Sequence, residues 1–198
     1  MVKILLAGDT HCGDKAGLTP PDLCTTEAQR ALWEWWEAFH AEHSFDMAIF
    51  TGDMVEGQNN KNTIELFETD TEKQAEIAAE CMGVIHCSKS AMFTVYGTPF
   101  HTAGTYSFEN HFTDALGIAR PQTVQRIDVS GLIRLNVKHT VGRSSIPYGQ
   151  GTPTYKEMVN ELLNAELADD DAADIVIRGH AHYSVGMRVR DRAAIVVP

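Results

Sequence analysis

Short runs of apolar residues recur along the chain, and most of them end in a glycine or a polar residue. They are rich in aliphatic and β-branched side chains, which at this length favours strands over helices. They do not alternate with polar residues, which is typical of strands covered on both faces. We therefore predict buried strands over residues 3–7, 46–51, 91–96, 132–138 and 174–178, with a further apolar strand within residues 193–198.

Between these runs, apolar residues recur at the three- and four-residue spacing of an amphipathic helix. This pattern predicts helices over residues 26–43, 71–89 and 154–167. Glycine and proline mark residues 13–24 and 142–153 as loops. Because strands and helices alternate along the chain, the expected fold class is α/β, with helices layered on sheets.

The first predicted helix begins at a capping residue and carries three tryptophans. Thr25 or Thr26 is suited to cap its N-terminus. Trp35 and Trp36 are expected to pack on a sheet. Trp33 is expected to face elsewhere, because helix residues two positions apart do not share a face.

The length of 198 residues predicts one domain, residues 1–198. The formal net charge is −11, and the 16 Lys and Arg residues are scattered along the chain. A basic stripe is the usual footprint of a nucleic-acid-binding surface, so this charge does not favour nucleic acid as a partner. Bound divalent cations would add positive charge locally, which keeps a phosphate-bearing substrate compatible with the composition.

Four cysteines occur without a CxxC pair, in a chain too large and too poor in cysteine to be a disulfide scaffold. Reduced thiols and a cytoplasmic location are the better interpretation. No apolar stretch approaches the roughly 18 residues of a transmembrane helix, and the first apolar run leads directly into a charged motif. A membrane partner and a signal peptide are therefore not expected. The final apolar strand is compatible with a natural end or with a cut from a longer protein, and nothing in the sequence indicates an oligomeric state.

Aspartate and histidine side chains follow several of the predicted strands. An Asp and a His come directly after the first strand, an Asp after the second, and His residues after the later ones. In α/β sheets the carboxyl ends of the strands line a common crevice, so these side chains should converge. Imidazole nitrogen and carboxylate oxygen suit metals such as zinc, manganese or iron. The predicted ligands are Asp9, His11, Asp53, His139, His180 and His182.

Three blocks carry most of these residues: Gly-Asp-Thr-His at 8–11, Gly-Asp-Met-Val-Glu-Gly at 52–57 and Gly-His-Ala-His at 179–182. In this order and wide spacing they resemble the GDxH, GDxx(D/E) and GHxH blocks of the calcineurin-like metallophosphoesterase superfamily. The resemblance spans nearly the whole chain. It implies a four-layer α/β/β/α sandwich of two mixed sheets packed face to face, and a dinuclear site for two divalent ions (manganese, zinc or iron).

On the family pattern one shared aspartate, Asp53, bridges the two metal ions. The remaining ligands implied are Asp9, His11 and His182 for the first ion, and His139 and His180 for the second.

The block after the third strand departs from the GNH(D/E) pattern of the family, whose Asn completes the second metal site and whose His acts on the leaving group. Here the sequence reads Gly97-Thr98-Pro99-Phe100-His101, with Thr98 in the place of the Asn. His101 comes two positions later than the family His, and its role is open between metal ligand, general acid and substrate contact. This variant, with the proline-containing loop and Trp-rich helix after the first block, resembles a phage- or prophage-associated branch.

Three more residues could act around the metals. Thr98 could contact substrate or support a ligand. Glu56 could hold a ligating histidine by a hydrogen bond, or be an ordinary solvated acid. Arg143 could grip a phosphate oxygen, or be an exposed loop arginine. The histidines within or beside predicted helices are interpreted as packing residues: His40, His43, His86 and His111.

The main hypothesis is a metal-dependent phosphoric ester hydrolase that cleaves a phosphodiester, or a phosphomonoester, with a metal-activated water. Asp53 and His101 are the candidate catalytic residues, with His101 protonating the leaving oxygen. Diesterase chemistry is favoured because the arginine that the protein-phosphatase branch carries soon after its second Asp is missing. The alternatives are a DNA or RNA nuclease of the same superfamily, and a catalytically impaired metal-binding scaffold.

Overall fold

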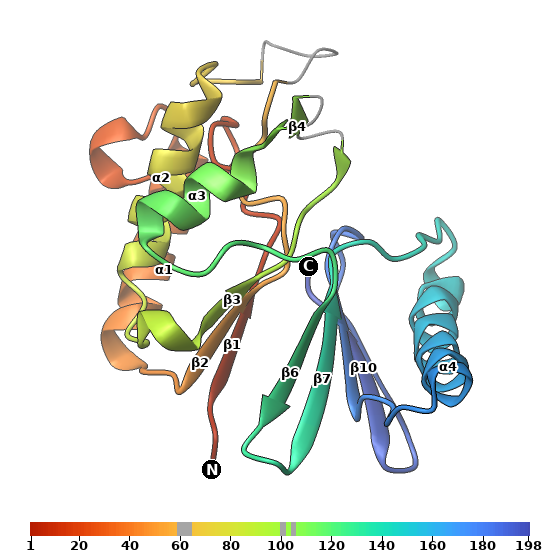
Figure 1. Cartoon of the computed structure of the whole chain (residues 1–198). Helices are drawn as coiled ribbons and strands as arrows, with labels where there is room; N and C mark the ends of the chain where they lie inside the picture. The colour runs from red at the N-terminus through yellow and green to blue at the C-terminus, as the bar shows by residue number, and fades with distance from the viewer. Residues whose placement is uncertain (59–64, 100–101, 104–105) are drawn as a thin grey trace.

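A computed structural model describes residues 1–58, 65–99, 102–103 and 106–198 of the chain. Two β-sheets face each other at its centre, and helices cover the outer side of each sheet (Figure 1). The layers therefore run helix, sheet, sheet, helix, as the four-layer α/β/β/α prediction requires.

The smaller sheet holds three strands in the order β1-β2-β3. Each of them lies within a predicted range: β1 Ile4–Ala7, β2 Met47–Phe50 and β3 Met92–Thr94. Both pairings are parallel, and parallel neighbours need a crossover connection, which here contains a helix each time. Two mixed sheets are implied by the family resemblance, whereas the described strands of this smaller sheet are parallel throughout.

The larger sheet is mixed and has the strand order β6-β7-β8-β10-β9. Its three inner strands, β7 Ile133–Lys138, β8 Ile175–Arg178 and β10 Arg192–Val196, coincide with predicted apolar runs. The two edge strands, β6 Gln125–Val129 and β9 Val185–Val189, are not predicted. Each edge strand mixes exposed and covered residues and is interrupted by polar residues or glycine, so neither shows a continuous apolar run.

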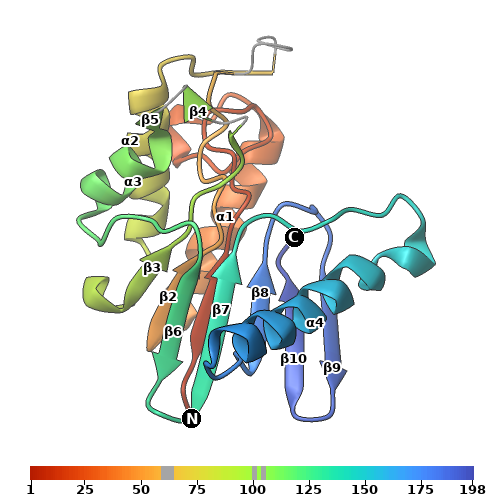
Figure 2. The ribbon, with the colours of Figure 1, turned by 45° about the vertical axis from the view of Figure 1, so that its right-hand side comes forward.

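Three helices cover the smaller sheet and one crosses the larger sheet (Figures 1 and 2). The first three are α1 Glu27–Glu42, α2 Thr71–Gly83 and α3 Phe108–Leu116, and the last is α4 Gly151–Ala168. The nine residues of α3 show little more than two turns of periodicity, and this helix is not predicted. None of the helices in the described part of the chain is both long and apolar enough to cross a membrane.

Several smaller elements complete the chain. A two-stranded antiparallel pair, β4 Thr102–Ala103 with β5 Tyr106–Ser107, precedes α3. Short 3-10 turns occupy Pro21–Leu23, Lys89–Ala91 and Pro147–Gly149. The second helix ends six residues before its predicted end at residue 89, since Gly83 terminates it. The fourth begins three residues early, because Pro153 is tolerated within a first turn.

Helix α1 shows the predicted cap but a different tryptophan face. Thr26 is the N-cap: its hydroxyl accepts from the Gln29 N–H at 3.2 Å, and Gln29 Oε1 accepts from the Thr26 N–H at 3.2 Å. Trp33 and Trp36 are each 6% exposed, whereas Trp35 is 58% exposed. The expectation is therefore wrong for Trp33 and Trp35, because positions three apart share a helix face and neighbouring positions do not.

Strand β2 is covered on both faces, which explains its unbroken apolar sequence. Successive strand residues point to opposite sides of a sheet. Ile49 belongs to the core between the sheets, together with Leu135 and Ile177. Phe50 belongs to the core under the helices, where its ring meets Phe112 of α3 edge to face at 5.6 Å. The sandwich thus has one apolar core between the sheets and another beneath the helices.

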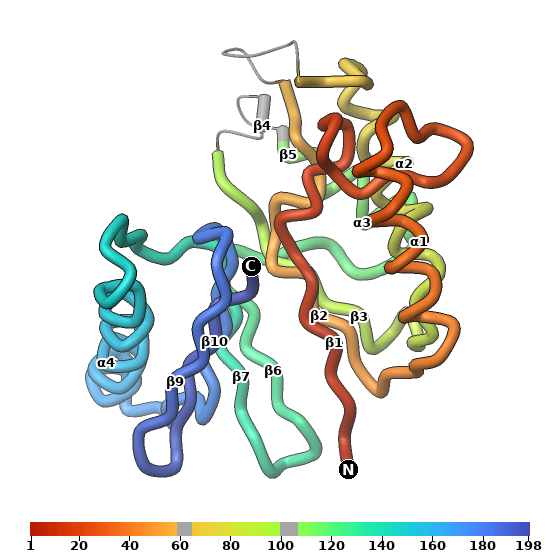
Figure 3. The backbone as a smooth tube through the Cα atoms, turned by 180° about the vertical axis from the view of Figure 1, so that it is seen from behind, coloured from red at the N-terminus to blue at the C-terminus, as the bar shows by residue number. Residues whose placement is uncertain are grey.

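The carboxyl ends of the parallel strands lie at one end of the sandwich. Figure 3 shows the C-terminus between the two halves of the molecule at this end. Loops from both sheets therefore meet there, which is where ligands gather in α/β folds.

Candidate metal centre

The segments that follow β1 and β2 run side by side beyond the sheet. The N–H of Asp9 donates to the Gly52 carbonyl at 3.0 Å, and the N–H of His11 donates to the Asp53 carbonyl at 3.2 Å. These bonds continue the parallel pairing past the last strand residues. They hold the Asp-x-His segment at a set separation from the second aspartate.

Left-handed backbone conformations are concentrated in the predicted ligands. In the described chain, eight non-glycine residues have a positive φ, and five of the eight are predicted metal ligands. This conformation costs roughly 1–2 kcal/mol for each residue with a Cβ. Such strain persists where the surrounding structure enforces it, and it clusters at functional sites. The five are Asp9 (φ 50°), His11 (45°), Asp53 (51°), His180 (69°) and His182 (55°).

A first group of ligand-type atoms comes from the loop after β1 and the loop after β8. One side-chain atom from each of Asp9, His11 and His182 lies within 4.8 Å of the other two. Nε2 of His182 is 3.2 Å from Asp9 Oδ1, and Nε2 of His11 is 3.9 Å from the same oxygen. Both imidazoles thus present nitrogen toward one carboxylate oxygen.

A second group lies deeper and comes from the ends of β2, β7 and β8. It consists of Asp53, His139 and His180, again with one atom each within 4.8 Å of the others. Nε2 of His139 is 2.9 Å from Asp53 Oδ2, and both of these side chains are 1% exposed. The rings of His139 and His180 meet edge to face at 5.2 Å.

Hydrogen bonds on the far side of two imidazoles set which nitrogen carries the proton. Nδ1 of His139 lies 2.7 Å from the Thr51 carbonyl, which can only accept, so Nδ1 donates. Nδ1 of His11 lies 2.8 Å from Oε2 of Glu56, and it donates to this carboxylate. In both residues Nε2 is therefore the nitrogen left to face the group, and partners of this kind orient metal-binding histidines in proteins.

Backbone and hydroxyl donors orient the two carboxylates. The N–H of His180 donates to Asp9 Oδ2 at 3.0 Å. The N–H of Thr98 donates to Asp53 Oδ1 at 2.6 Å, and the Thr98 hydroxyl donates to Asp53 at 3.2–3.3 Å. Thr98 is 9% exposed, and both of its donors bond to the carboxylate of Asp53. This supports the interpretation of Thr98 as a residue that holds a ligand in place.

The Gly97–Thr98 turn is held by a buried acid that the sequence did not single out. Glu109, in the first turn of α3, is fully buried, and its Oε1 accepts from the Gly97 N–H at 3.1 Å. A Cβ added at Gly97 would lie 2.0 Å from Asp53 Oδ1 and 2.6 Å from Glu109 Oε1. Only glycine leaves room for the backbone to approach Asp53 this closely.

The charges of the site are strongly perturbed by burial. Burial raises the pKa of Asp9 by disfavouring its carboxylate, and the nearby Asp53 adds to this. Burial alone would lower the pKa of His139, but the hydrogen bond and charge of Asp53 raise it overall. Burial lowers the pKa of His180, and the positive charges of His139 and Arg143 act in the same direction. Two buried carboxylates so close together favour a bound cation.

Burial would likewise lower the pKa of His11, but the hydrogen bond and charge of Glu56 raise it overall. Glu56 is 9% exposed, so the structure supports its role beside a predicted ligand over that of a solvated loop acid.

The residues present fit a divalent metal. With the proton of His139 on Nδ1, Nε2 of the neutral ring and Oδ2 of Asp53 face each other at 2.9 Å as two acceptors, and Oδ1 of Asp9 likewise accepts no hydrogen bond in the described part of the chain. A buried polar atom without a partner costs about 1–3 kcal/mol, and a cation between the facing ligand atoms would satisfy these atoms. Imidazole nitrogen and carboxylate oxygen are also the donors that borderline divalent metals accept.

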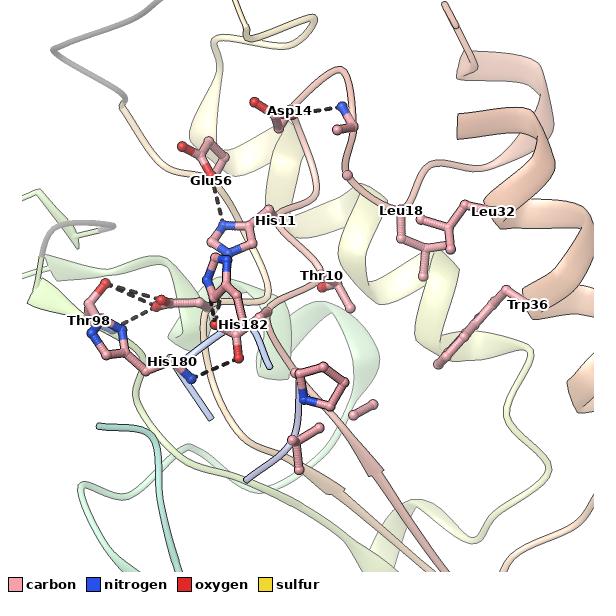
Figure 4. Close-up of a pocket in the computed structure, with 18 of the residues that line it drawn as sticks. Thr10, His11, Asp14, Leu18, Leu32, Trp36, Glu56, Thr98, His180 and His182 are labelled. Atoms are coloured by element: carbon pink, nitrogen blue, oxygen red, sulfur yellow. Dashed lines mark hydrogen bonds and ion pairs between the residues drawn. The ribbon is translucent and has the colours of Figure 1, made fainter. Parts of the chain in front are cut away.

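A cavity of about 840 Å³ opens onto the groups (Figure 4). Its polar part is lined by Asp9, His11, Asp53, His180 and His182, with Thr98, Glu56 and Arg143. Arg143 is exposed and lines the same cavity as His180, and its positive charge contributes to the lowered pKa of His180. The cavity therefore presents an arginine as well as the ligand groups.

The structure brings together all six predicted ligands, in two groups of three. It pairs Asp53 with His139 and His180, and whether Asp53 also bridges to the first group stays a prediction. His101 lies outside the described residues. His40, His43, His86 and His111 belong to neither group. His40 is buried and packs in the core, whereas His43 and His86 are exposed, so the interpretation as core packing residues does not hold for these two.

Two features of the site were missed from the sequence. One is Glu109, which sits in the unpredicted helix α3. The other is an apolar part of the cavity, lined in part by Leu18, Leu32 and Trp35. Neither feature carries a sequence motif. The apolar part of the cavity has one signal in the sequence, which is that apolar residues occur both in the loop after the first strand and along the first helix.

Comparison with solved structures identifies the fold. An archaeal phosphodiesterase matches 98% of this chain and 82% of its own, with 12% sequence identity and a TM-score of 0.51. A Vps29 single mutant from Entamoeba histolytica matches 98% of this chain and 72% of its own, at 14% identity and a TM-score of 0.45. A predicted phosphoesterase from Streptococcus pneumoniae matches 98% and 71%, at 12% identity and a TM-score of 0.43. No protein-family model matches the chain, and no curated protein matches its sequence.

The layer order and the likeness to the archaeal phosphodiesterase show that the fold is metallophosphoesterase-like, as the sequence blocks predicted. Sequence identities this low establish the fold alone. The phage-associated branch stays a prediction.

Proposed function

We propose that this chain, which has a metallophosphoesterase-like fold, is a metal-dependent phosphoric ester hydrolase. Its preferred substrates would be phosphodiesters, with phosphomonoesters as the alternative. The observation that carries the proposal is the pair of three-residue ligand groups at one end of a cavity that also presents an arginine.

The two groups would hold two divalent ions. Asp9, His11 and His182 would hold one, and Asp53, His139 and His180 the other, with Asp53 as the bridge. When bound, such ions neutralise charge on phosphoryl oxygens and make a water molecule acidic enough to serve as a nucleophile near neutral pH. Manganese, zinc and iron all suit these donors.

The protein's own residues prepare the site before substrate arrives. Glu56 and the Thr51 carbonyl keep the protons of His11 and His139 on Nδ1, so that Nε2 of each ring faces the other ligand atoms. The N–H groups of His180 and Thr98 orient the two carboxylates. This fixed arrangement means that little reorganisation is needed when the phosphoester binds.

Substrate handling falls to two residues. Arg143 would bind a phosphoryl oxygen that faces the cavity, because its guanidinium can donate two parallel hydrogen bonds. We propose His101 as the group that protonates the leaving oxygen, since it follows the Gly97–Thr98 turn beside Asp53. Catalysis would then combine charge neutralisation with proton delivery.

A nuclease activity is less well supported. The net charge is −11, and the described cavity offers a single arginine among its acidic and histidine side chains. A polynucleotide needs several cationic contacts to its backbone. Small phosphodiesters fit this electrostatic setting better.

The proposal is tested with protein purified without chelator. Elemental analysis should find two divalent ions per chain, and bis-4-nitrophenyl phosphate should be hydrolysed in the presence of manganese. His182→Gln should lower kcat/KM by at least about 100-fold. Loss of a residue that only supports a metal ligand already costs up to roughly 100-fold, and His182 is itself a proposed ligand. The substitution should also lower the metal content.

His43→Gln is the matched control, because His43 is an exposed histidine at the end of α1 and belongs to neither group. It should retain activity and metal. Full metal occupancy without hydrolysis of any phosphoester would refute the proposed activity and favour a metal-binding scaffold. Specific nicking of DNA or RNA that is lost in Asp53→Asn would instead establish a nuclease.

A further inference from the structure

The cavity over the ligand groups has a second, apolar part that phosphoester hydrolysis alone does not require. Figure 4 shows Leu18, Leu32 and Trp36 on one side of Thr10, and His11 and His182 on the other. All of these residues line the same cavity. The apolar part is built from the loop after β1 and from helix α1.

This apolar part is held rigidly relative to the metal groups. The N–H of Leu18 donates to the Thr10 carbonyl at 3.0 Å, within the loop that also carries His11. Nε1 of Trp36 donates to the Cys81 carbonyl at 2.9 Å, which anchors the indole. The distance between the apolar wall and the ligand groups is therefore set by the fold.

Helix α1 is tied to the same loop by a buried glutamine. Nε2 of Gln29, a fully buried residue, donates to the Asp14 carbonyl and to the Thr19 hydroxyl, each at 3.0 Å. These two hydrogen bonds connect the loop after β1 to the helix. A preformed wall of this kind loses little conformational entropy when a ligand binds.

Two apolar side chains at this wall remain exposed. Leu32 is 36% exposed and Trp35 is 58% exposed, and both line the cavity. The indole of Trp35 has a defined orientation, because its ring stacks on Phe39 with centroids 5.6 Å apart and planes 15° apart. A leucine and an indole that share a cavity with metal-ligand groups offer a binding surface for an apolar group.

The charges along the cavity exclude other occupants. Asp14 and Glu65 line it near the apolar part, and the chain is acidic overall. Arg143 is the one Lys or Arg among the described residues that line the cavity, so a second phosphate on the substrate would meet the carboxylates of Asp14 and Glu65. An uncharged apolar group meets no such repulsion.

We infer that the substrate is a phosphodiester whose non-leaving group is uncharged and apolar, an aromatic ring or an alkyl chain, seated against Leu18, Leu32, Trp35 and Trp36. This inference rests on the proposed function, because it assigns a substrate class to the same site. The phosphoryl group lies over the ligand groups, and the apolar substituent lies along α1.

The test uses 4-nitrophenyl phosphodiesters that share one leaving group and differ in the other ester: methyl, hexyl or phenyl. For the full chain with manganese, kcat/KM should rise by roughly 10–100-fold from methyl to hexyl or phenyl, the range typical of filling an apolar pocket. The hexyl and phenyl arms separate a chain-binding wall from a ring-binding one. In Leu32→Ser and Trp35→Ala this rise should shrink to a few-fold.

Leu163→Ser is the matched control, because Leu163 is a 57% exposed leucine on α4 and does not line the cavity. It should keep the full rise. Hydrolysis with equal kcat/KM for all three esters would overturn the inference and leave the proposed function standing.

A binding measurement covers the case in which no ester is hydrolysed, which would sink the proposed function itself. Calorimetric titration should show phenylphosphonate or hexylphosphonate binding at least 10-fold more tightly than methylphosphonate, with the difference lost in Trp35→Ala. Equal affinities for the three phosphonates would overturn the inference whatever the catalytic result.

Discussion

The backbone N–H of His180 donates a 3.0 Å hydrogen bond to Oδ2 of Asp9, although the two residues are 171 positions apart in the sequence. Asp9 follows a strand of the smaller sheet, and His180 follows a strand of the larger one. The bond leaves Oδ1 of Asp9 to face His11 and His182. The geometry of the site therefore depends on how the two sheets pack together.

Thr98 should tune metal affinity through Asp53. Thr98→Val removes the hydroxyl that donates to the carboxylate at 3.2–3.3 Å but keeps the 2.6 Å bond from the backbone N–H. We expect the dissociation constant for manganese or zinc to rise about 10-fold, the lower end of the cost of losing an outer partner of a ligand. Calorimetric metal titration measures it. Thr98→Ser should bind as the wild type does, and an unchanged constant in Thr98→Val would show that the backbone bond suffices.

Gly97 should tolerate no side chain. In Gly97→Ala the new Cβ would lie 2.0 Å from Asp53 Oδ1 and 2.5 Å from the Asp53 backbone nitrogen. We expect the free energy of unfolding to fall by roughly 1–3 kcal/mol, as for other overpacked sites, together with loss of metal binding. Urea denaturation and elemental analysis measure both effects.

Gly83→Ala is the control for this variant, because a Cβ at Gly83 meets nothing within 4 Å and the residue ends α2. It should raise stability by about 0.4–1 kcal/mol, through lower entropy of the unfolded chain. Equal effects of the two substitutions would mean that crowding at Asp53 is not the cause.

His40 should make the protein less stable in mild acid. The residue is 1% exposed, and its ring packs edge to face on Trp36 at 4.2 Å. Burial, with the positive charges of His86 and His43, lowers its pKa to about 4. The unfolded chain binds this proton near pH 6.5 and the folded chain only near pH 4, so unfolding becomes more favourable as the pH falls through this interval.

The expected loss between pH 6.5 and pH 4 is about 1–3 kcal/mol. It should appear as the difference between the wild type and His40→Phe, which keeps an aromatic ring but cannot titrate. Chemical denaturation at pH 7 and pH 4.5 measures both proteins and cancels effects of other groups. An equal loss of unfolding free energy between pH 7 and pH 4.5 in the two proteins would exclude His40 as the source of the acid sensitivity.

The two adjacent tryptophans of α1 should differ sharply in their contribution to stability. Trp36 is 6% exposed and donates a hydrogen bond to the Cys81 carbonyl, whereas Trp35 is 58% exposed. Trp36→Ala should lower the free energy of unfolding by about 3–5 kcal/mol, as for other large-to-small core substitutions. Trp35→Ala should cost less than about 1 kcal/mol. Thermal or urea denaturation measures both variants. Similar losses of stability in the two would contradict the conclusion that Trp36 is buried and Trp35 is not.

Local pattern was sufficient for the inner strands and for the ligand blocks. The runs that became β1, β2 and β8 are apolar without alternation, which is typical of strands covered on both faces, and such runs are visible without knowledge of their partners. The Asp and His residues directly follow them, so their convergence could be argued from the geometry of parallel strands.

The edge strands and the tryptophan face could not be read in the same way. Covered and exposed residues are mixed in β6 and β9, and their pairing partners are set by the sheet rather than by their own composition. We expected Trp35 and Trp36 to pack together on a sheet, although helical spacing favours Trp33 and Trp36, which lie three positions apart. The position of α1 on the sheet turns that pair inward.

The sequence alone identified the types of side chain at the site, but it did not determine how they are arranged. That Asp53 lies with His139 and His180, and that Asp9 and His11 lie with His182, follows from the packing of the two sheets, which joins residues 86 to 173 positions apart. The packing of α3 and α1 on the smaller sheet buries Glu109 beside Gly97 and brings the exposed face of α1 to the cavity of the metal groups. Local motifs encode which atoms can bind a metal, whereas distances between atoms on different elements exist only after the chain has folded.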